Sequence, residues 1–171
     1  FESLDAVYTV TEQLAKNQEH IAKKYKAKKY IAYFQNYTNT FLPLNDFRKY
    51  MEEAAQFPDI TELAVSTRPD CIKEEYLDAL RSVSEQYHCN ITIELGLQTA
   101  NYHTLLKIDR GHTLAEYIDA AIQIKRYGFD LCTHVILNLP GDTITDSIET
   151  AKILSALSNK KYEKKCHKML L

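Results

Sequence analysis

Four short apolar runs recur along the chain, and they restrict the fold more than any other feature of the sequence. Each run contains β-branched or aromatic residues and is mostly apolar on both faces, which is typical of a strand buried in a parallel sheet. Amphipathic segments of helical period separate the runs. This alternation favours a parallel α/β sheet with right-handed crossovers. The runs are YIAYF (30–34), ELAVS (62–66), ITIELGL (91–97) and LCTHVILNL (131–139).

The helices are predicted from apolar stripes and from their end signals. Thr9 with Glu12 and Thr113 with Glu116 match the capping box that begins helices, and Gly128 suits a helix C-terminus. The segments 43–57, 73–87 and 113–128 are therefore helical, with a first helix before them and a last helix after Pro140-Gly141. The predicted apolar faces are Phe47, Tyr50, Met51, Ala54 and Ala55; Tyr76, Leu77, Leu80, Val83 and Tyr87; and Ile148, Ala151, Leu154 and Leu157.

The order is one helix followed by four strand–helix units, which predicts either a partial (β/α) barrel or a small open sheet. At 171 residues, we expect a single domain over 1–171. The net charge of −2 gives no global field that favours nucleic acid or membrane. No apolar stretch reaches the roughly 18 residues of a transmembrane helix, and residues 1–10 do not have the pattern of a signal peptide.

The cysteines at 71, 89, 132 and 166 are too widely spaced for a CxxC motif. They give no support for a zinc ribbon or a self-contained cluster site, so we assign no metal ligand to this chain. Isolated cysteines without a secretory signal indicate reduced thiols and a cytoplasmic protein.

Polar residues follow or interrupt each predicted strand. They are QNYTNT (35–40), STRPD (66–70), Glu94 with Gln98, and His134 with Asn138 before the Pro140-Gly141-Asp142 turn. Ligands of parallel α/β folds bind beyond the carboxyl ends of the strands, so these residues are candidates for a binding site. Two interpretations of Glu94 stay open: it contacts a ligand, or it forms a buried ion pair with Arg68 or Arg110. His134 is either a hydrogen-bonded core histidine or a site residue.

Several segments together resemble the radical S-adenosylmethionine (radical SAM) superfamily, in its YhcC-like branch. They are YIAYFQNYTNT, STRPDC, IELGLQT, IDRGHT and HVILNLPGDT, in the order and spacing of that family. The resemblance implies a partial (β/α) barrel that holds S-adenosylmethionine and a [4Fe-4S] cluster. It also implies an oxidoreductase that cleaves S-adenosylmethionine reductively and makes a 5′-deoxyadenosyl radical, with tRNA or another RNA as a candidate substrate.

The resemblance also assigns roles by position. Gln35, Asn36 and Thr38 stand where the family meets the methionine amino group. Glu94 and Gln98 lie on the strand that approaches the ribose or the methionine end, and Arg110 could pair with the methionine carboxylate. The strand with His134 packs on adenine along Val135 to Asn138, although relatives often have glycine at the position of Asn138.

The sequence departs from the family at both ends. The CxxxCxxC motif that binds the cluster is absent, so we expect its cysteines upstream of Phe1 and no cluster on this chain alone. Beyond Leu157, the Lys-rich SNKKYEKKCHKMLL lacks the next strand of the barrel. An incomplete barrel has unpaired edges, so we expect the chain to self-associate.

Three other functions compete with this interpretation. KKYKAKK (23–29) and the Lys-rich tail could bind nucleic acid, although lysines also suit a solvated helix end. An aldolase or a metal-dependent hydrolase would need a lysine or a histidine cluster on the strands, which the sequence does not offer. A non-catalytic remnant of the same fold, binding nucleic acid or protein, is the third.

Overall fold

The computed structural model describes residues 8–36 and 38–157, with only the backbone of residues 23–25. Tyr37 and the Lys-rich tail lie outside the described residues, so the predictions made for them are not tested. The described part of the chain contains no helix that is long and apolar enough to cross a membrane.

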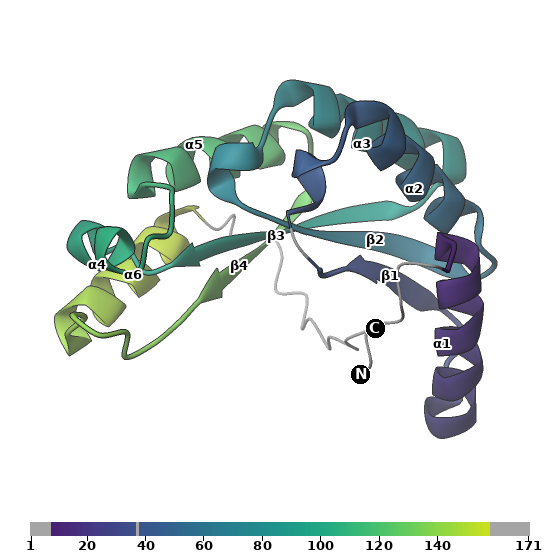
Figure 1. Cartoon of the computed structure of the whole chain (residues 1–171), viewed down its shortest axis with the longest axis horizontal. Coiled ribbons are helices and arrows are strands. Elements are labelled where there is room, and N and C mark those ends of the chain that lie inside the picture. Colours follow the sequence, from purple (N-terminus) through teal and green to yellow (C-terminus); the bar gives the residue numbers. More distant parts are fainter. Residues whose placement is uncertain (1–7, 37, 158–171) are drawn as a thin grey trace.

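The structure is an α/β fold around a parallel four-stranded sheet in the order β1-β2-β3-β4, which confirms the predicted fold class (Figure 1). The helices α2, α3 and α5 lie together on one side of this sheet. The strands are β1 (Tyr30–Phe34), β2 (Ile60–Thr67), β3 (Asn90–Gln98) and β4 (Asp130–Val135). The helices are α1 (Val10–Tyr25), α2 (Leu44–Gln56), α3 (Glu74–Tyr87), α4 (Tyr102–Lys107), α5 (Leu114–Arg126) and α6 (Ile144–Leu157), with short 3₁₀ turns at Asn39–Phe41 and Pro69–Cys71.

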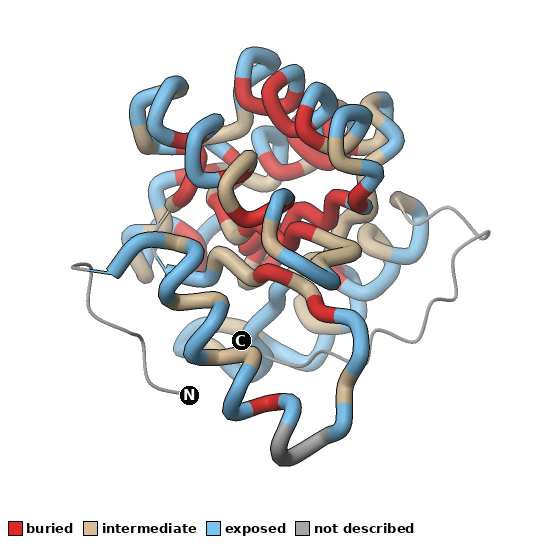
Figure 2. Tube along the Cα trace, turned by 90° about the vertical axis from the view of Figure 1, so that its right-hand side faces the viewer, coloured by how far each residue is buried: buried red, intermediate tan, exposed pale blue. Residues whose placement is uncertain are grey.

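The core lies between the sheet and these three helices. Alternate residues of the central strands point into it, among them Leu63 and Val65 of β2 and Ile93 and Leu95 of β3. Phe47 of α2 packs edge-on against Tyr76 of α3, with the ring centroids 5.1 Å apart. Figure 2 shows the buried residues gathered along the strands and on the inner sides of the helices. Because successive side chains alternate in direction, the intervening residues of β2 and β3 point to the opposite face.

Both predicted capping boxes are present. The Thr9 hydroxyl accepts from the Glu12 amide, and the Thr113 hydroxyl accepts from the Glu116 amide, while each glutamate accepts in return from the cap amide. Gly128 follows α5 with a φ of 77°, as expected at a helix end. The local signals of the sequence therefore fix where these helices begin and end.

Two predicted helix faces need correction. Tyr50 is 38% exposed, because at about 100° per residue it lies at the edge of the stripe formed by the buried residues of α2. On α6, Ile148 is 51% exposed and Ala151 is also exposed, whereas Leu154 and Leu157 pack against the core. The side of α6 that carries Thr150 faces the rest of the fold, because Thr150 is buried and its hydroxyl accepts from the Ala100 amide (3.0 Å).

The predicted strand 131–139 is too long, since β4 ends at Val135. The neighbouring β3 shifts its register between Gly96 and Gln98 and ends there, so the residues beyond Ile136 have no strand to pair with. The short helix α4 was not predicted, because its six residues hold too few turns for a helical period. Asn101 caps it by accepting from the amides of His103 and Thr104.

Candidate functional site

A chain of polar side chains crosses the open face of the sheet, the face opposite α2, α3 and α5. Ser66 Oγ on β2 donates to Tyr33 Oη on β1 (3.1 Å), and Tyr33 donates to Glu94 Oε2 on β3 (2.6 Å). His134 Nε2 on β4 lies 2.8 Å from the same carboxylate oxygen. All four strands therefore contribute to one hydrogen-bonded network.

Glu94 is the buried centre of this network, with an exposed fraction of 4%. Tyr33 reaches it across β2 because the residue of β2 in register with Tyr33 is the small Ala64. Among the described residues, the predicted ion pair of Glu94 with Arg68 or Arg110 does not occur: Arg68 pairs with Asp70, and His134 lies beside Glu94. The structure gives Glu94 a phenol and an imidazole as partners instead.

Arg68 is held in the loop after β2. Its Nε and Nη2 donate to the two carboxylate oxygens of Asp70 at 2.9 Å and 2.8 Å, and this contact raises the pKa of the arginine. Gly111, at a φ of 78°, lets the guanidinium pass, since a Cβ there would lie 2.5 Å from Arg68 Nη2. The segments STRPD and DRGH therefore meet beyond the carboxyl ends of β2 and β3.

Arg110 is a partly buried cation with few hydrogen-bond partners. Its Nη2 lies 3.5 Å from the Gly96 carbonyl, and its buried Nε has no hydrogen-bond partner among the described residues. Burial lowers the pKa of this guanidinium, and the nearby Arg68 charge lowers it further. An arginine stays protonated in such surroundings, so the site presents a positive charge with an unused N–H group.

Gly96 creates the space in which Arg110 lies. A Cβ at this position would be 2.5 Å from Arg110 Nη2 and 2.6 Å from Gln98 Nε2. The missing side chain therefore brings a guanidinium and an amide together at the carboxyl end of β3. Gln98 has a φ of 71°, in the left-handed region, where the strand leaves the sheet. Glu94, Gln98 and Arg110, all predicted site residues, share this end of β3, and His134 adjoins Glu94.

The predicted residues after β1 lie at another part of the site. Gln35 and Asn36 are exposed and Thr38 is half-buried, and β2 separates them from Arg110. Asn39, also within the candidate stretch 35–40, fixes this loop: its Nδ2 donates to the carbonyls of Phe34 (2.8 Å) and Ser66 (2.9 Å). The loop is therefore attached to both β1 and β2.

Asn138 lies in the loop after β4 rather than on the strand. The Ile136 amide still donates to the Gln98 carbonyl (2.8 Å), and the chain then leaves the sheet. Asn138 has a φ of 62°, which asparagine tolerates better than most residues. Further along, Asp142 Oδ1 is buried and has no hydrogen-bond partner in the described part of the chain.

Two residues of the open face have no role assigned from the sequence. Tyr33 lies within an apolar run, and Cys132 is one of the isolated cysteines, whereas Ser66 belongs to the candidate stretch STRPD. In register, Ser66, Glu94 and Cys132 are neighbours across β2, β3 and β4. The period-two pattern would place Cys132 and His134 on one face, but their position beside Glu94 depends on the register of the sheet.

The described cysteines lie apart, on the turn Pro69–Cys71 (Cys71), before β3 (Cys89) and on β4 (Cys132). Within residues 8–36 and 38–157, they form no group of three thiolates that could hold an iron–sulfur cluster.

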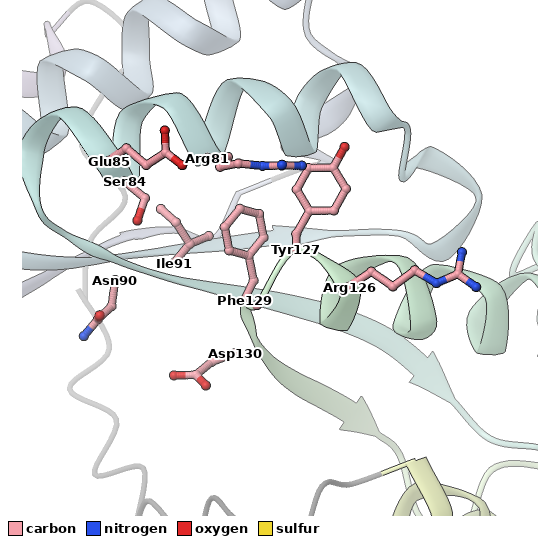
Figure 3. Close-up of a pocket in the computed structure, with 10 residues that line it drawn as sticks. Arg81, Ser84, Glu85, Asn90, Ile91, Arg126, Tyr127, Phe129 and Asp130 are labelled. Atoms are coloured by element: carbon pink, nitrogen blue, oxygen red, sulfur yellow. The ribbon is translucent and has the colours of Figure 1, made fainter.

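A shallow pocket of about 270 Å³ lies at the other end of the sheet (Figure 3). Phe129 and Ile91 form its base, and the Arg81 guanidinium lies 4.0 Å from the centre of the Tyr127 ring at its rim. It opens at the amino ends of β3 and β4, away from Glu94 and Arg110. Since ligands of parallel α/β folds bind at the carboxyl ends, this pocket is not the candidate site.

Comparison with known protein families agrees with the fold. The model of the Radical SAM superfamily matches residues 5–154. The chain belongs to this superfamily. The superfamily predicted from the ordered sequence segments is thereby confirmed.

Among curated proteins, this radical SAM chain is 35% identical to the uncharacterized protein YtqA of Bacillus subtilis strain 168 over 83% of its length, and 37% identical to YhcC of Escherichia coli strain K12 over 83%. It covers 43% and 45% of these relatives, so it spans less than half of their length. It is also 26% identical to the tRNA-2-methylthio-N(6)-dimethylallyladenosine synthase of Fusobacterium nucleatum, over 86% of this chain and 34% of that protein.

Two solved structures show the same fold. The Elp3 protein of Methanocaldococcus infernus matches with a TM-score of 0.72 and 18% identity, over 85% of this chain and 38% of its own. The radical SAM enzyme HemN of Escherichia coli matches with a TM-score of 0.63 and 17% identity, over 87% and 35%. These similarities support the interpretation of the sheet as part of a radical SAM barrel.

The radical SAM superfamily implies S-adenosylmethionine and a [4Fe-4S] cluster, and the described residues fit only the first. The Arg110 guanidinium, whose Nε has no hydrogen-bond partner among the described residues, suits a carboxylate ligand at the end of β3. The separated cysteines do not suit a cluster.

Proposed function

We propose that the complete protein that carries this chain is a radical SAM enzyme, and that this chain supplies the strands that contact S-adenosylmethionine and substrate. When bound to the complete protein, S-adenosylmethionine and a [4Fe-4S] cluster would supply the radical chemistry. The cluster is held by cysteines outside this chain. The protein residues bind the cofactor, orient it and exclude water.

The observation that carries the proposal is the Arg110 guanidinium at the carboxyl end of β3. Its buried Nε has no hydrogen-bond partner in the described part of the chain, and its Nη2 lies beside Gly96, next to Gln98 Nε2. A carboxylate would complete its hydrogen bonds and offset its charge, which suits the methionine end of S-adenosylmethionine. Gln98, whose Nε2 also lies beside Gly96, donates a second hydrogen bond in this proposal.

The other predicted residues take roles around this anchor. Gln35, Asn36 and Thr38, at the end of β1, accept hydrogen bonds from the methionine amino group. The exposed apolar residues Val135 and Ile136 flank the adenine, with Asn138 at the turn beyond them. Glu94 and His134 lie deeper on the open face and reach the ribose or the substrate.

We propose tRNA as the substrate class, because the Fusobacterium nucleatum relative is named as a tRNA-modifying synthase. The exposed lysines 26, 28 and 29 after α1 are available for phosphate contacts. The competing function is a non-catalytic remnant that binds RNA or protein without cleaving S-adenosylmethionine. Formation of 5′-deoxyadenosine separates the two.

The test uses the complete protein, purified and loaded with its cluster under anaerobic conditions. With dithionite it should convert S-adenosylmethionine to 5′-deoxyadenosine and methionine, measured by chromatography. Arg110→Ala should weaken binding of S-adenosylmethionine about 10- to 100-fold in calorimetry, since a charged hydrogen bond contributes about 1.5–3 kcal/mol.

Arg48→Ala removes an exposed arginine from α2 and is the matched control, which should bind like the wild type. Equal affinity in Arg110→Ala and the wild type would remove Arg110 from the site. Failure of the cluster-loaded wild type to form 5′-deoxyadenosine would overturn the proposed enzyme.

A further inference from the structure

We propose that Glu94, Cys132 and His134 form a Zn²⁺ site on the open face of the sheet. A carboxylate oxygen, the Cys132 sulfur and a ring nitrogen of His134 all lie within 4.8 Å of one another. The spacing of these residues along the sequence does not reveal the group, because its ligands come from two strands. The site shares Glu94 and His134 with the proposed function but not the Arg110 anchor, and its test needs no S-adenosylmethionine.

The register of the sheet assembles the three ligands. Glu94 of β3 is paired with Cys132 of β4, and Gly96 with His134. Because residues two apart on a strand point to the same side, Cys132 and His134 both face the open side next to Glu94. All three positions therefore lie on strands, which hold side chains more rigidly than loops do.

The distances suit a tetrahedral metal after a small adjustment. Ligand atoms at about 2.0–2.3 Å from a zinc ion lie about 3.3–3.8 Å apart. Glu94 Oε2 and His134 Nε2 are 2.8 Å apart, a hydrogen-bond distance, so a metal ion would replace the shared proton and move these atoms slightly apart. The side chain of His134 is 43% exposed, which leaves it room to move.

The chemistry of the ligand set selects the metal. A thiolate, an imidazole and a carboxylate together suit zinc, whereas magnesium and calcium prefer oxygen ligands. Tyr33 donates to Glu94 at 2.6 Å and is donated to by Ser66, so the carboxylate already has the outer hydrogen bonds that orient metal ligands.

Three protein ligands leave the fourth position of a tetrahedral zinc ion open. In this site that position would point away from the sheet, into the space of the open face. An oxygen, nitrogen or sulfur atom of the substrate could coordinate there. The metal would then position the substrate relative to the carboxyl ends of the strands.

The test measures zinc on the complete protein with its cluster loaded, so that the cluster cysteines are occupied. After incubation with Zn²⁺ and dialysis, we expect one additional zinc per chain, measured by elemental analysis. X-ray absorption at the zinc edge should show one sulfur neighbour with nitrogen or oxygen. In Cys132→Ser, the zinc should lose its sulfur neighbour. The amount of zinc that this variant retains should fall at least about tenfold.

Matched controls separate this site from others on the chain. Cys71→Ser changes a half-buried thiol elsewhere, and the double variant Cys166→Ser with His167→Gln removes the pair in the tail. Both should keep the zinc and its sulfur neighbour. Should Cys132→Ser fold poorly, Tyr33→Phe tests the same site and should weaken zinc binding about 10- to 100-fold.

Two results would overturn the proposal. One is wild-type protein that retains no zinc above its cluster metal. The other is a zinc–sulfur neighbour that persists in Cys132→Ser. Because neither measurement needs S-adenosylmethionine, a failure here is distinguishable from a failure of the proposed enzyme function.

Discussion

At the scale of single residues, Glu94 must be satisfied as a buried acid before it can serve any ligand. Its carboxylate is almost fully covered, and it accepts from Tyr33 while facing His134. A buried carboxylate without such partners would cost several kcal/mol. The network of the open face therefore allows an acidic group in the middle of the sheet.

Replacing Glu94 separates this structural role from a ligand role. Glu94→Ala leaves Tyr33 and His134 without their acceptor, so the free energy of unfolding should fall by about 1–3 kcal/mol in urea titrations. If Glu94 also contacts S-adenosylmethionine, the binding free energy should weaken by a similar amount, about 1–3 kcal/mol. Glu94→Gln keeps one acceptor oxygen and should destabilise less.

Glu149→Ala on α6 is the control, because its carboxylate is exposed and its contact with Lys152 is a surface ion pair. A Glu94→Ala protein that melts lower but binds S-adenosylmethionine unchanged would leave Glu94 with a structural role alone.

At the scale of elements, His112 joins β3 to the start of α5. Its Nε2 lies 2.9 Å from the Gly96 carbonyl and its Nδ1 lies 3.3 Å from the Thr113 carbonyl. A neutral imidazole can donate to only one of these oxygens. Burial nevertheless lowers the pKa of His112 below its ordinary value, and the Arg110 charge adds to this effect. The folded protein therefore keeps this ring neutral at pH values where the unfolded chain protonates it.

The protein should lose stability as the pH falls below about 6.5, because the unfolded state then binds a proton that folded His112 does not. The contribution is fully present above the unfolded pKa and decreases as the pH approaches the lower folded value. Denaturant titrations between about pH 7 and pH 5 would measure how the free energy of unfolding changes with pH.

In His112→Gln, the contribution of this histidine to the pH dependence of the free energy of unfolding should disappear. His103→Asn, on the exposed side of α4, should keep that contribution. The pKa values of Glu12 and Asp146 are lowered by hydrogen bonds to Thr9 and Thr143, from ordinary values of 4.5 and 3.8, so their effects fall at lower pH. Parallel pH curves for His112→Gln and the wild type would contradict the assignment.

Elements with strong local signals were predictable, and contacts between elements were not. The capping threonines and the apolar runs placed the helices and strands, because these signals act over a few residues. The end of β4 was misplaced, because it depends on the register shift of β3 between Gly96 and Gln98. The site followed the same rule: Glu94, Gln98 and Arg110 were named in advance, whereas Tyr33 and Cys132 join it only through pairing across strands.

At the scale of the whole molecule, the sheet has two edges and an apolar rim. Among the described strands, β1 and β4 each pair on one side only. The loop after β4 and the start of α6 expose large apolar side chains, with Leu137 68%, Ile144 82% and Ile148 51% exposed. Unpaired strand edges and contiguous apolar surfaces promote association.

This chain by itself should therefore associate at micromolar concentration, as sedimentation velocity would show. Ile144→Glu together with Ile148→Glu should shift the distribution toward the monomer, because a charged surface opposes apolar contact. Phe41→Glu, an equally exposed apolar residue after β1, should have less effect. A wild-type monomer that binds no hydrophobic dye would contradict the prediction and the interpretation of the sheet as an incomplete barrel.

The separation of apolar packing and polar contacts onto opposite faces of the sheet has an evolutionary consequence. The apolar core lies between the strands and α2, α3 and α5, whereas the polar network lies on the other side. Mutations on the open face therefore change ligand contacts while removing little apolar packing. Descendants of one ancestral sequence could exchange Tyr33, Ser66 or Cys132 for other side chains and acquire new substrates, with the folding of the scaffold preserved throughout the change.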